Sequence, residues 1–364
     1  MGKDKTLAVS AIVTVQDIQA YYLDNPVAPS NVEAMFPIEQ SRSKTWKTIS
    51  NGSTYVNEAA DPMSLNSKVP VSGRPGFGTV MGDMTTFGKA REMTADDLEE
   101  FAELKRLFGE TKNPAVAQRL IDFYGNDLKF VRDAMRAEMC YLGNALLSNA
   151  CNIGFLVANS PYMQGITAMD YGVDTWQKNA VSASWATAST DILADIASVI
   201  ATAKTHGKIL RKIKINKTWF EYVRMNTQIQ KYCATMVQNL YSTQAPPTLV
   251  AVNSMIAGYF NSDIAFEVID ETITRASLND VKTVANPFAD GVAVFTMETR
   301  VGHFSWNPIY IDSPQLETYE SFFVVGSTKQ VNPSFSEIYA KGRAFPVVDT
   351  YADNFYLKIN AVSW

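Results

Sequence analysis

Side chains suited to covalent or metal chemistry are sparse in this sequence. Its 364 residues include two histidines, His206 and His303, and three cysteines, Cys140, Cys151 and Cys233. No CxxC pair, HExxH motif or acidic calcium loop accompanies them, so we expect no bound metal. We predict that the cysteines are packed, reduced thiols. His206 is expected in the last turn of a helix, and His303 in a turn between two strands.

Motifs for nucleophilic and nucleotide chemistry are also missing. The stretch "SGRPGFG" (72–78) is rich in glycine, but it fits neither GxGxxG nor GxxxxGK[ST]. No GxSxG occurs, and the paired carboxylates Asp96 and Asp97 stand at the start of a helical pattern. The sequence therefore predicts no catalytic residue and no cofactor, and a protein that is not an enzyme. An enzyme whose site is assembled without a linear motif remains an alternative.

One stretch, 204–217, is strongly basic. Its cations are not interrupted by any acid, which is one pattern that could contact a phosphate backbone. The other interpretation is a solvent-facing or edge strand that lysines protect against pairing with another sheet. The net charge of −5 favours the second interpretation. The candidates for contact with DNA or with a neighbouring subunit are Lys208, Arg211, Lys212 and Lys214.

The composition is that of a globular protein. Apolar residues make up 46% and charged residues 19%, so the chain can bury a large core and is long enough for two domains. No run of eighteen apolar residues occurs, so no membrane span is expected.

Three helices are predicted in the first half of the chain. The first spans 94–108, with Thr94 and Asp97 as a capping box and Gly109 as its end. The second spans 114–124, between an Asn113 cap and a stop at Gly125. The third spans 126–150 and would be about 37 Å long, which suits the spine of a domain. Its apolar stripe consists of Leu128, Val131, Met135, Met139, Leu142 and Leu146.

The second half reads as mixed helix and strand. Helices are expected at 189–206, 218–240 (with Thr218 and Glu221 as a capping box) and 254–260. Strands are expected at 209–216, 248–252, 263–269, 292–298, 320–326 and 355–362. The last strand alternates, which predicts one buried face formed by Phe355, Leu357, Ile359 and Ala361.

Residues 51–92 form the most unusual segment. Glycine and proline punctuate it, and short alternating pieces such as "KVPVS" suggest a long, imperfect β-hairpin. Two strands alone are marginal in water, so such a hairpin needs a partner surface. We therefore predict that it lies on a neighbouring subunit. Its candidate assembly contacts are Lys68, Arg74, Phe77 and Phe87.

The order of these parts resembles the Hong Kong 97-type phage capsid fold, and in particular the lambda-type major capsid protein E family. The resemblance rests on segment order and on two blocks of sequence. They are "NPFADGVAVFTMETRVGHFSWNP" (286–308) and "GRAFPVVDTYADNFYLKINAV" (342–362).

The resemblance implies an α+β fold in five parts. These are an N-terminal arm (1–50), an extended β-hairpin loop (51–92), a peripheral domain with the spine helix (93–165), an axial α/β domain (166–320) and strands that return to the peripheral domain (321–364).

The resemblance also implies a function. The chain would be the subunit of an icosahedral virion shell, present as hexamers and pentamers and assembled in the host cytoplasm. Its partners would be other copies of itself, a scaffold, a portal, possible decoration proteins and weakly bound double-stranded DNA. Some relatives join subunits through a Lys–Asn isopeptide bond, which Lys68 or Lys89 with Asn354 or Asn360 could imitate.

The start of the chain also bears on assembly. It begins almost at the arm, which suggests either a separate scaffold protein or a processed, mature chain.

Two alternatives remain within structural proteins. A bacterial nanocompartment shell, similar to encapsulin, has the same fold but encloses a cargo enzyme. Another virion component, such as a tail tube, would be expected to consist mostly of strands, which the long spine helix argues against.

Overall fold

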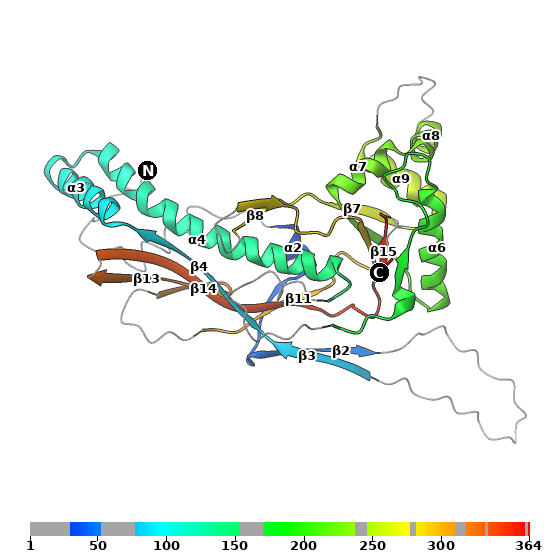
Figure 1. Cartoon of the computed structure of the whole chain (residues 1–364), viewed down its shortest axis with the longest axis horizontal. Helices are drawn as coiled ribbons and strands as arrows, with labels where there is room; N and C mark the ends of the chain where they lie inside the picture. Colours follow the sequence, from blue (N-terminus) through cyan, green and yellow to red (C-terminus); the bar gives the residue numbers. More distant parts are fainter. Residues whose placement is uncertain are drawn as a thin grey trace, which may run out of the picture.

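The computed structural model describes residues 30–51, 77–152, 170–236, 246–276, 282–309, 317–331, 334–360 and 363–364. In these parts the chain forms two larger β-sheets, each with its own helices, and two two-stranded sheets (Figure 1). A long sheet and the helix α4 run along the long axis, while the helices α6 to α9 gather at one end around a shorter sheet.

The larger sheet has six strands and is organised around its longest one. Its path is β1-β11-β14-β13-β12, and β4 also pairs with β14. The partner β13 pairs antiparallel with one side of β14, while β4 and β11 follow one another along the other side. The strands are β1 (Ile38–Gln40), β4 (Thr85–Met93), β11 (Gly302–Trp306), β12 (Glu317–Glu320), β13 (Phe323–Val331) and β14 (Ser334–Val348).

Two helices follow β4. The first, α3 (Ala95–Thr111), has the predicted capping box, in which Asp97 N–H donates to the Thr94 hydroxyl and Thr94 N–H donates to the Asp97 carboxylate. It continues past Gly109 and ends where Lys112 adopts a left-handed conformation with φ 48°. The predicted stop at this glycine is therefore wrong.

The two helices predicted at 114–124 and 126–150 are one. Helix α4 (Pro114–Ser148) has 35 residues, is capped by Asn113 as predicted, and would be about 52 Å long. Gly125 is a buried position inside it. A glycine costs a helix interior only about 1 kcal/mol, which the packing of a spine helix outweighs.

The spine helix covers the larger sheet. All six residues of its predicted stripe are buried in one cluster with the sheet residues Phe304, Val325 and Phe345. The short helix α2 (Asn31–Met35) joins the same cluster through Val32 and Met35. Residues 30–40, which fall in the predicted N-terminal arm (1–50), pack on their own subunit.

The smaller sheet has the order β5-β15-β10-β6-β7. Its strands are β5 (Lys178–Ala180), which follows the 3-10 turn η1 (Thr175–Gln177), β6 (Lys212–Asn216), β7 (Ala265–Ile269), β10 (Val292–Thr296) and β15 (Phe355–Lys358). The helices of this end are α6 (Ile192–Thr205), α7 (Lys217–Met225), α8 (Thr227–Met236) and α9 (Leu249–Phe260).

Both faces of the smaller sheet are buried. Ala293 and Phe295 belong to the cluster formed with the helices, whereas Val292 and Val294 belong to the cluster around the spine helix. The alternation predicted for 355–362 is thus only half right, because Tyr356 is buried as fully as its neighbours Phe355 and Leu357.

Several predicted elements differ from those observed. Residues 248–252 are not a strand, because Thr248 caps α9. The helix expected at 218–240 is interrupted at Asn226, and Asn216 rather than Thr218 caps its first part. His303 lies within β11, not in a turn.

The sequence blocks do not follow the sheets as expected. Strands β11 and β12 fall inside 166–320 but belong to the larger sheet, whereas β15, expected to return to the peripheral sheet, belongs to the smaller one.

Two further hairpins complete the described chain. Strands β2 (Thr45–Asn51) and β3 (Phe77–Asp83) pair antiparallel, and we call them the finger strands. Strands β8 (Ile273–Ala276) and β9 (Lys282–Ala285) form the other pair, beside α4. In Figure 1 the finger strands lie below the larger sheet.

Two connections between the sheets are fastened to each other. The first, 297–301, leads from β10 to β11, and the second, 349–354, leads from β14 to β15. The Val301 carbonyl accepts from Asp349 N–H at 3.0 Å and from the Thr350 hydroxyl at 3.0 Å. These bonds keep the two connections side by side.

Candidate assembly surfaces

The inner face of the finger strands packs on the body of the same subunit. The Trp46 indole stacks on Tyr171 and on Phe345, with ring centroids 5.3 Å and 5.2 Å away. Thr48, two residues on and also buried, donates from its hydroxyl to an Asp349 carboxylate oxygen at 3.0 Å. This part of the hairpin therefore has a hydrophobic partner within its own chain.

The outer face of the finger strands is open to solvent. The ladder places Lys47 opposite Met81 and Ile49 opposite Thr79, so these four side chains share one face. Ile49 is 56% exposed and Met81 is 63% exposed. Such apolar side chains, flanked by a lysine, are suited to contact with another molecule.

The predicted loop contacts fall in different places. Lys68 and Arg74 lie outside the described residues. Phe77 is the first residue of β3, but its side chain is not among those described. Phe87 is not in the finger strands: it lies in β4, half-buried, with its ring 6.1 Å from that of Phe322 in the spine cluster. It serves the core of its own subunit.

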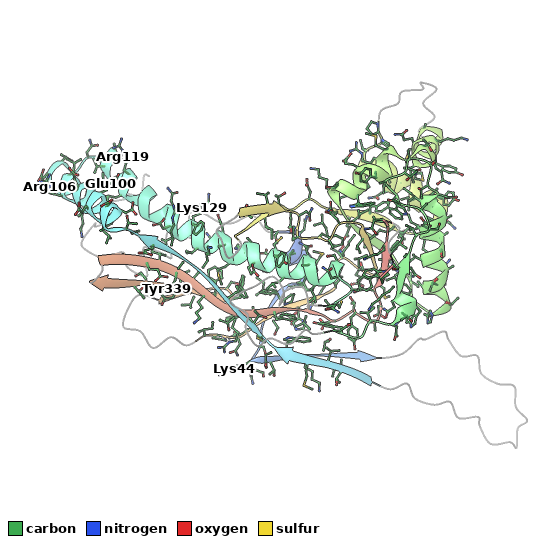
Figure 2. All side chains as sticks on the ribbon, viewed as in Figure 1. Lys44, Glu100, Arg106, Arg119, Lys129 and Tyr339 are labelled. Carbon is green, nitrogen blue, oxygen red and sulfur yellow. The ribbon has the colours of Figure 1, made fainter. Side chains whose placement is uncertain are left out.

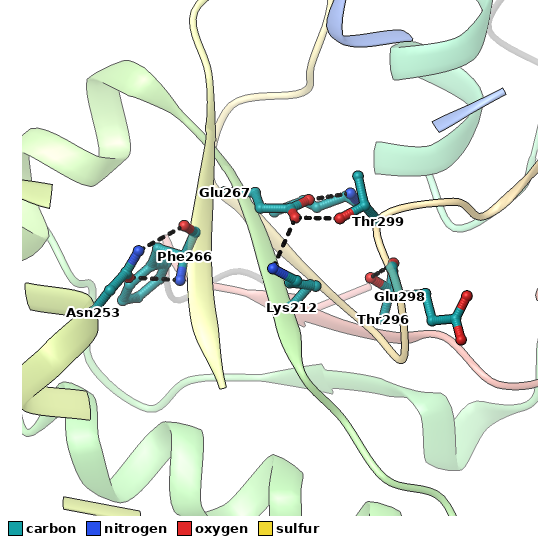
Figure 3. A network of polar contacts seen from close by, with 8 residues as sticks. Lys212, Asn253, Phe266, Glu267, Thr296, Glu298 and Thr299 are labelled. Carbon is teal, nitrogen blue, oxygen red and sulfur yellow. Dashed lines mark hydrogen bonds and ion pairs between the residues drawn. The ribbon is translucent and has the colours of Figure 1, made fainter. Parts of the chain in front are cut away.

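The predicted basic stretch forms part of a central strand, not an edge. Strand β6 lies between β10 and β7, so the interpretation of lysines guarding an edge strand is wrong. The Lys214 side chain is 1% exposed, and its Nζ lies 2.5 Å from Glu267 Oε2. Lys212 Nζ lies 3.3 Å from the other oxygen, which also accepts from the Thr299 hydroxyl at 2.5 Å (Figure 3).

The electrostatics of this network favour a charged carboxylate. Burial alone would raise the pKa of Glu267, but Lys214, Thr299 and Lys212 together hold that pKa below its ordinary value. Burial lowers the pKa of Lys214, and the carboxylate opposes that effect. The network thus stabilises the fold by pairing charges across adjacent strands.

Other cations of the stretch are paired too. Lys208 forms an ion pair with Asp353 in the second connection between the sheets, and Lys217 forms one with Asp270. Arg211 is exposed. Of the four residues predicted to contact DNA or a neighbour, Lys208, Lys212 and Lys214 therefore have acidic partners in their own chain.

One of the two edges of the smaller sheet, at β7, is covered by a side chain. Asn253 of α9 accepts from Phe266 N–H at 2.8 Å and donates to the Phe266 carbonyl at 3.1 Å (Figure 3). Phe266 lies in β7, the last strand of the sheet. The amide therefore occupies a position where a strand of another molecule would otherwise pair.

The end formed by α7, α8 and α9 exposes apolar side chains. Helix α9 carries no charged residue, and Val250 is exposed at its start. The exposed large apolar residues of this end are Tyr222, Met225, Tyr232, Leu249, Val250 and Tyr259.

The helix α3 lies at the opposite end of the molecule and is described along its whole length. None of its residues is buried, and its first turn is acidic. Figure 2 shows Glu100 and Arg106 on this helix, far from Lys44 at the root of the finger strands. Helix α3 and the α7–α9 end are thus two separate surfaces that a neighbouring copy could cover.

The thiols and histidines form no reactive cluster within the described ranges. Burial raises the pKa of the Cys151 thiol to about 12 and also raises the pKa values of the Cys140 and Cys233 thiols. All three cysteines are buried and free, as predicted. The described residues contain no group of three or more His, Cys, Asp and Glu side chains placed to hold a metal ion.

The residues named for an isopeptide bond lie in different surroundings, and one of the two asparagines is buried in its own chain. Asn354 is fully buried; its side chain accepts from the Thr350 hydroxyl and its carbonyl accepts from Gln177. The Asn360 side chain lies against Gly291. Lys89 is exposed on β4, and Lys68 lies outside the described residues.

Sequence reasoning missed two acidic residues that organise the structure. In the sequence, Glu267 falls in a predicted strand (263–269) and Asp349 in the predicted returning segment (321–364). Each accepts from partners far away in sequence, at Lys214 and Thr48 respectively. No local pattern marks such residues, because their partners are set by the sheet topology.

Comparisons with known proteins give a likeness in structure. No family model matches the sequence, and no curated protein matches it. A putative capsid protein of a prophage from E. coli CFT073 superposes with a TM-score of 0.56 at 10% identity, covering 96% of this chain and 100% of that one.

Two further structures agree. A phage-related protein from Bordetella bronchiseptica RB50 gives a TM-score of 0.52 at 8% identity, covering 97% of this chain and 99% of that one. The capsid of cyanophage A-1(L) gives 0.50 at 10% identity, covering 94% and 96%. Among the described residues, no helix is long and apolar enough to cross a membrane. The chain has the Hong Kong 97-type fold of phage capsid proteins.

Proposed function

We propose that this protein is a major capsid protein, many copies of which assemble into an icosahedral shell around phage DNA. The observation that carries the proposal is the superposition on phage capsid proteins along nearly the whole chain, with 96% covered by the prophage protein. A match of this extent must span most of the spine helix and of both sheets.

The exposed surfaces support the proposal. The finger strands pack inward through Trp46 and Thr48, and present Ile49 and Met81 outward. A contact between this face and a different face of the next copy is heterologous, and such contacts close into rings when the rotation fits. Hexamers and pentamers are the rings that an icosahedral shell needs. Many modest contacts then act together through effective concentration.

The proposal includes further partners. A scaffold, a portal and decoration proteins are the components that the assembly of such a shell uses, and the packaged DNA would be held by weak, non-specific contact. The ion pairs of Lys212 and Lys214 leave Arg211 as the exposed candidate of the basic stretch for that contact. A role in catalysis is not part of the proposal.

The experiment shortens the hairpin without touching the described strands. Asn51 pairs with Phe77, so replacing 52–76 with Asn-Gly would join the strands through a two-residue turn. The expected product is a folded subunit, with unchanged thermal unfolding, that forms no shells under electron microscopy. An Ile49→Ser, Met81→Ser variant of full length serves as a milder test of the outer face.

Two results would count against the proposal. Shells of normal size from the shortened chain would show that the hairpin is not an assembly element. A wild-type protein that stays monomeric at high concentration, with and without a scaffold, would remove the shell function. Particles that contain a protein cargo and no nucleic acid would instead favour a nanocompartment shell. The similarity to phage capsid structures argues against that alternative.

A further inference from the structure

Besides the packing of Trp46, one carboxylate ties the finger strands to the body. Asp349 uses both of its oxygens: Oδ1 accepts from the Thr48 hydroxyl at 3.0 Å, and Oδ2 lies 2.8 Å from His303 Nδ1. Thr48 belongs to β2 and His303 to β11, so the carboxylate joins the hairpin to the larger sheet.

The same residue stands at the junction of the two sheets. Asp349 begins the second connection, and its N–H donates to the Val301 carbonyl of the first. Asp349 therefore contacts the finger strands through its side chain and the first connection through its backbone.

His303 is the group in this cluster that changes charge near neutral pH. Its side chain is 21% exposed. The charged groups around it are Asp349, Glu39 on β1 and Arg300 in the first connection, and Lys47 lines the same small polar cavity between β1, β2 and β11.

We propose that Asp349 and His303 form a protonation-dependent latch that fixes the finger strands to the body through Thr48. With His303 charged, its ion pair orients the carboxylate and presents Oδ1 to Thr48. When His303 loses its proton, the ion pair becomes a hydrogen bond from a neutral imidazole to the carboxylate; the attraction between opposite charges is lost, so the carboxylate is freer to turn toward solvent.

The direction of the pH effect follows from the surroundings of His303. The hydrogen bond to Asp349 raises the pKa of His303 above its ordinary value of 6.5, against the opposing effect of burial. A raised pKa means that the ion pair is complete below pH 6.5 and is lost as the pH rises through the folded-state pKa. The hold of Asp349 on Thr48 therefore weakens as the pH rises above the folded-state pKa of His303.

A spin label on the outer face measures the latch directly. Thr79 is exposed on β3, and the native cysteines are buried, so a Thr79→Cys variant can be labelled with a nitroxide at one position. The label should become more mobile as the pH rises, with a midpoint above 6.5. A label at Ser254→Cys, exposed on α9, should show no such transition.

Three variants of the labelled protein separate the latch from a general loosening. Thr48→Val should make the label mobile at every pH, whereas Thr48→Ser, which keeps the hydroxyl, should retain the transition. His303→Gln should abolish the pH dependence. Thermal unfolding of each variant shows that it is folded.

The inference is overturned by either of two results. One is a wild-type label whose mobility does not change between pH 5.5 and 9; the other is a Thr48→Val variant that keeps the wild-type transition. Neither outcome bears on whether shells form, because the measurement uses the unassembled chain and the shell proposal depends on the outer face.

Discussion

The buried ion pair of the smaller sheet should respond very differently to the loss of its two partners. Lys214 is 1% exposed, while Glu267 keeps 26% of its side chain in solvent and has Lys212 and Thr299 as additional partners. Removing the carboxylate in Glu267→Gln leaves a buried ammonium without its counter-charge. Removing the lysine in Lys214→Met leaves a carboxylate that still has a cation, a hydroxyl and water.

The expected costs follow from this asymmetry. Breaking a buried pair by deleting one partner typically costs about 3–5 kcal/mol, and Lys212 cannot replace the lost carboxylate, so we expect about 3 kcal/mol for Glu267→Gln. Lys214→Met also removes the desolvation cost of a buried ammonium, and the remaining carboxylate keeps Lys212, the Thr299 hydroxyl and solvent, so this variant should cost only about 1 kcal/mol. The difference of about 2 kcal/mol corresponds to roughly a 30-fold change in the opening equilibrium.

Native-state hydrogen exchange of the β6 and β7 amides is the assay, because it reports local opening of this sheet without the rest of the chain. The matched control is Lys217→Met, whose partner Asp270 and whose own side chain are each 54% exposed. An exposed pair should contribute less than about 1 kcal/mol. The reasoning would be refuted if Lys214→Met cost more than Glu267→Gln, or if Glu267→Gln cost no more than the control.

Three further predictions concern the same chain. The pKa of Glu267 is held below its ordinary value of 4.5, so the contribution of Glu267 to stability is present above pH 4.5 and is lost as the pH falls through its folded-state pKa. Measurements of unfolding at decreasing pH should show this loss of stability. The Glu267→Gln variant should not show it. Thr94→Ala removes the capping box and should destabilise α3 by about 1 kcal/mol. The expected result is faster hydrogen exchange of the amides in the first turn of α3 only. Unchanged exchange at these amides would contradict the prediction. Gly302→Ala would place a Cβ 1.8 Å from the Val347 carbonyl oxygen. We therefore expect the free energy of unfolding, measured by heat or urea, to fall by at least about 2 kcal/mol. An unfolding midpoint equal to that of the wild type would show that β11 can shift away from the clash.

Local sequence signals predicted the elements whose stability is local. The capping box of α3, the Asn113 cap and the apolar stripe of α4 all depend on residues within a few positions of one another, and the structure confirms each of them. The observed ends differ where packing outweighs propensity. Gly125 should stop a helix in isolation, but the spine helix continues through it against the larger sheet.

The sheet topology was harder to predict, because it depends on contacts far apart in the chain. Residues 248–252 include three β-branched side chains, which favours a strand. Thr248 nevertheless caps a helix that packs on the smaller sheet. The residue types of β15 alternate as they would in a strand with one exposed face, although both faces of β15 are buried. Nothing within either segment indicates which surface covers it.

The basic stretch shows the same limitation for charge. A run of cations in the sequence has no partner within it, so contact with another molecule was a reasonable hypothesis. In the fold, Glu267 in β7, Asp270 directly after it and Asp353 in the second connection lie beside these lysines. Charge balance is achieved between neighbouring strands, so a sequence window cannot distinguish a binding surface from an internal network.

The part of the hairpin that could use a neighbouring subunit is its outer face, not its root. Its root is not short of hydrophobic partners, because Trp46 is stacked between Tyr171 and Phe345. A root that is anchored in its own subunit fixes the direction in which the outer face points. Among the described side chains of that face, Ile49 and Met81 are exposed apolar residues. In the proposed shell, a neighbour would therefore meet a surface that is already oriented. Pre-orientation of this kind lowers the ordering cost of each contact, which a shell of many weak contacts needs.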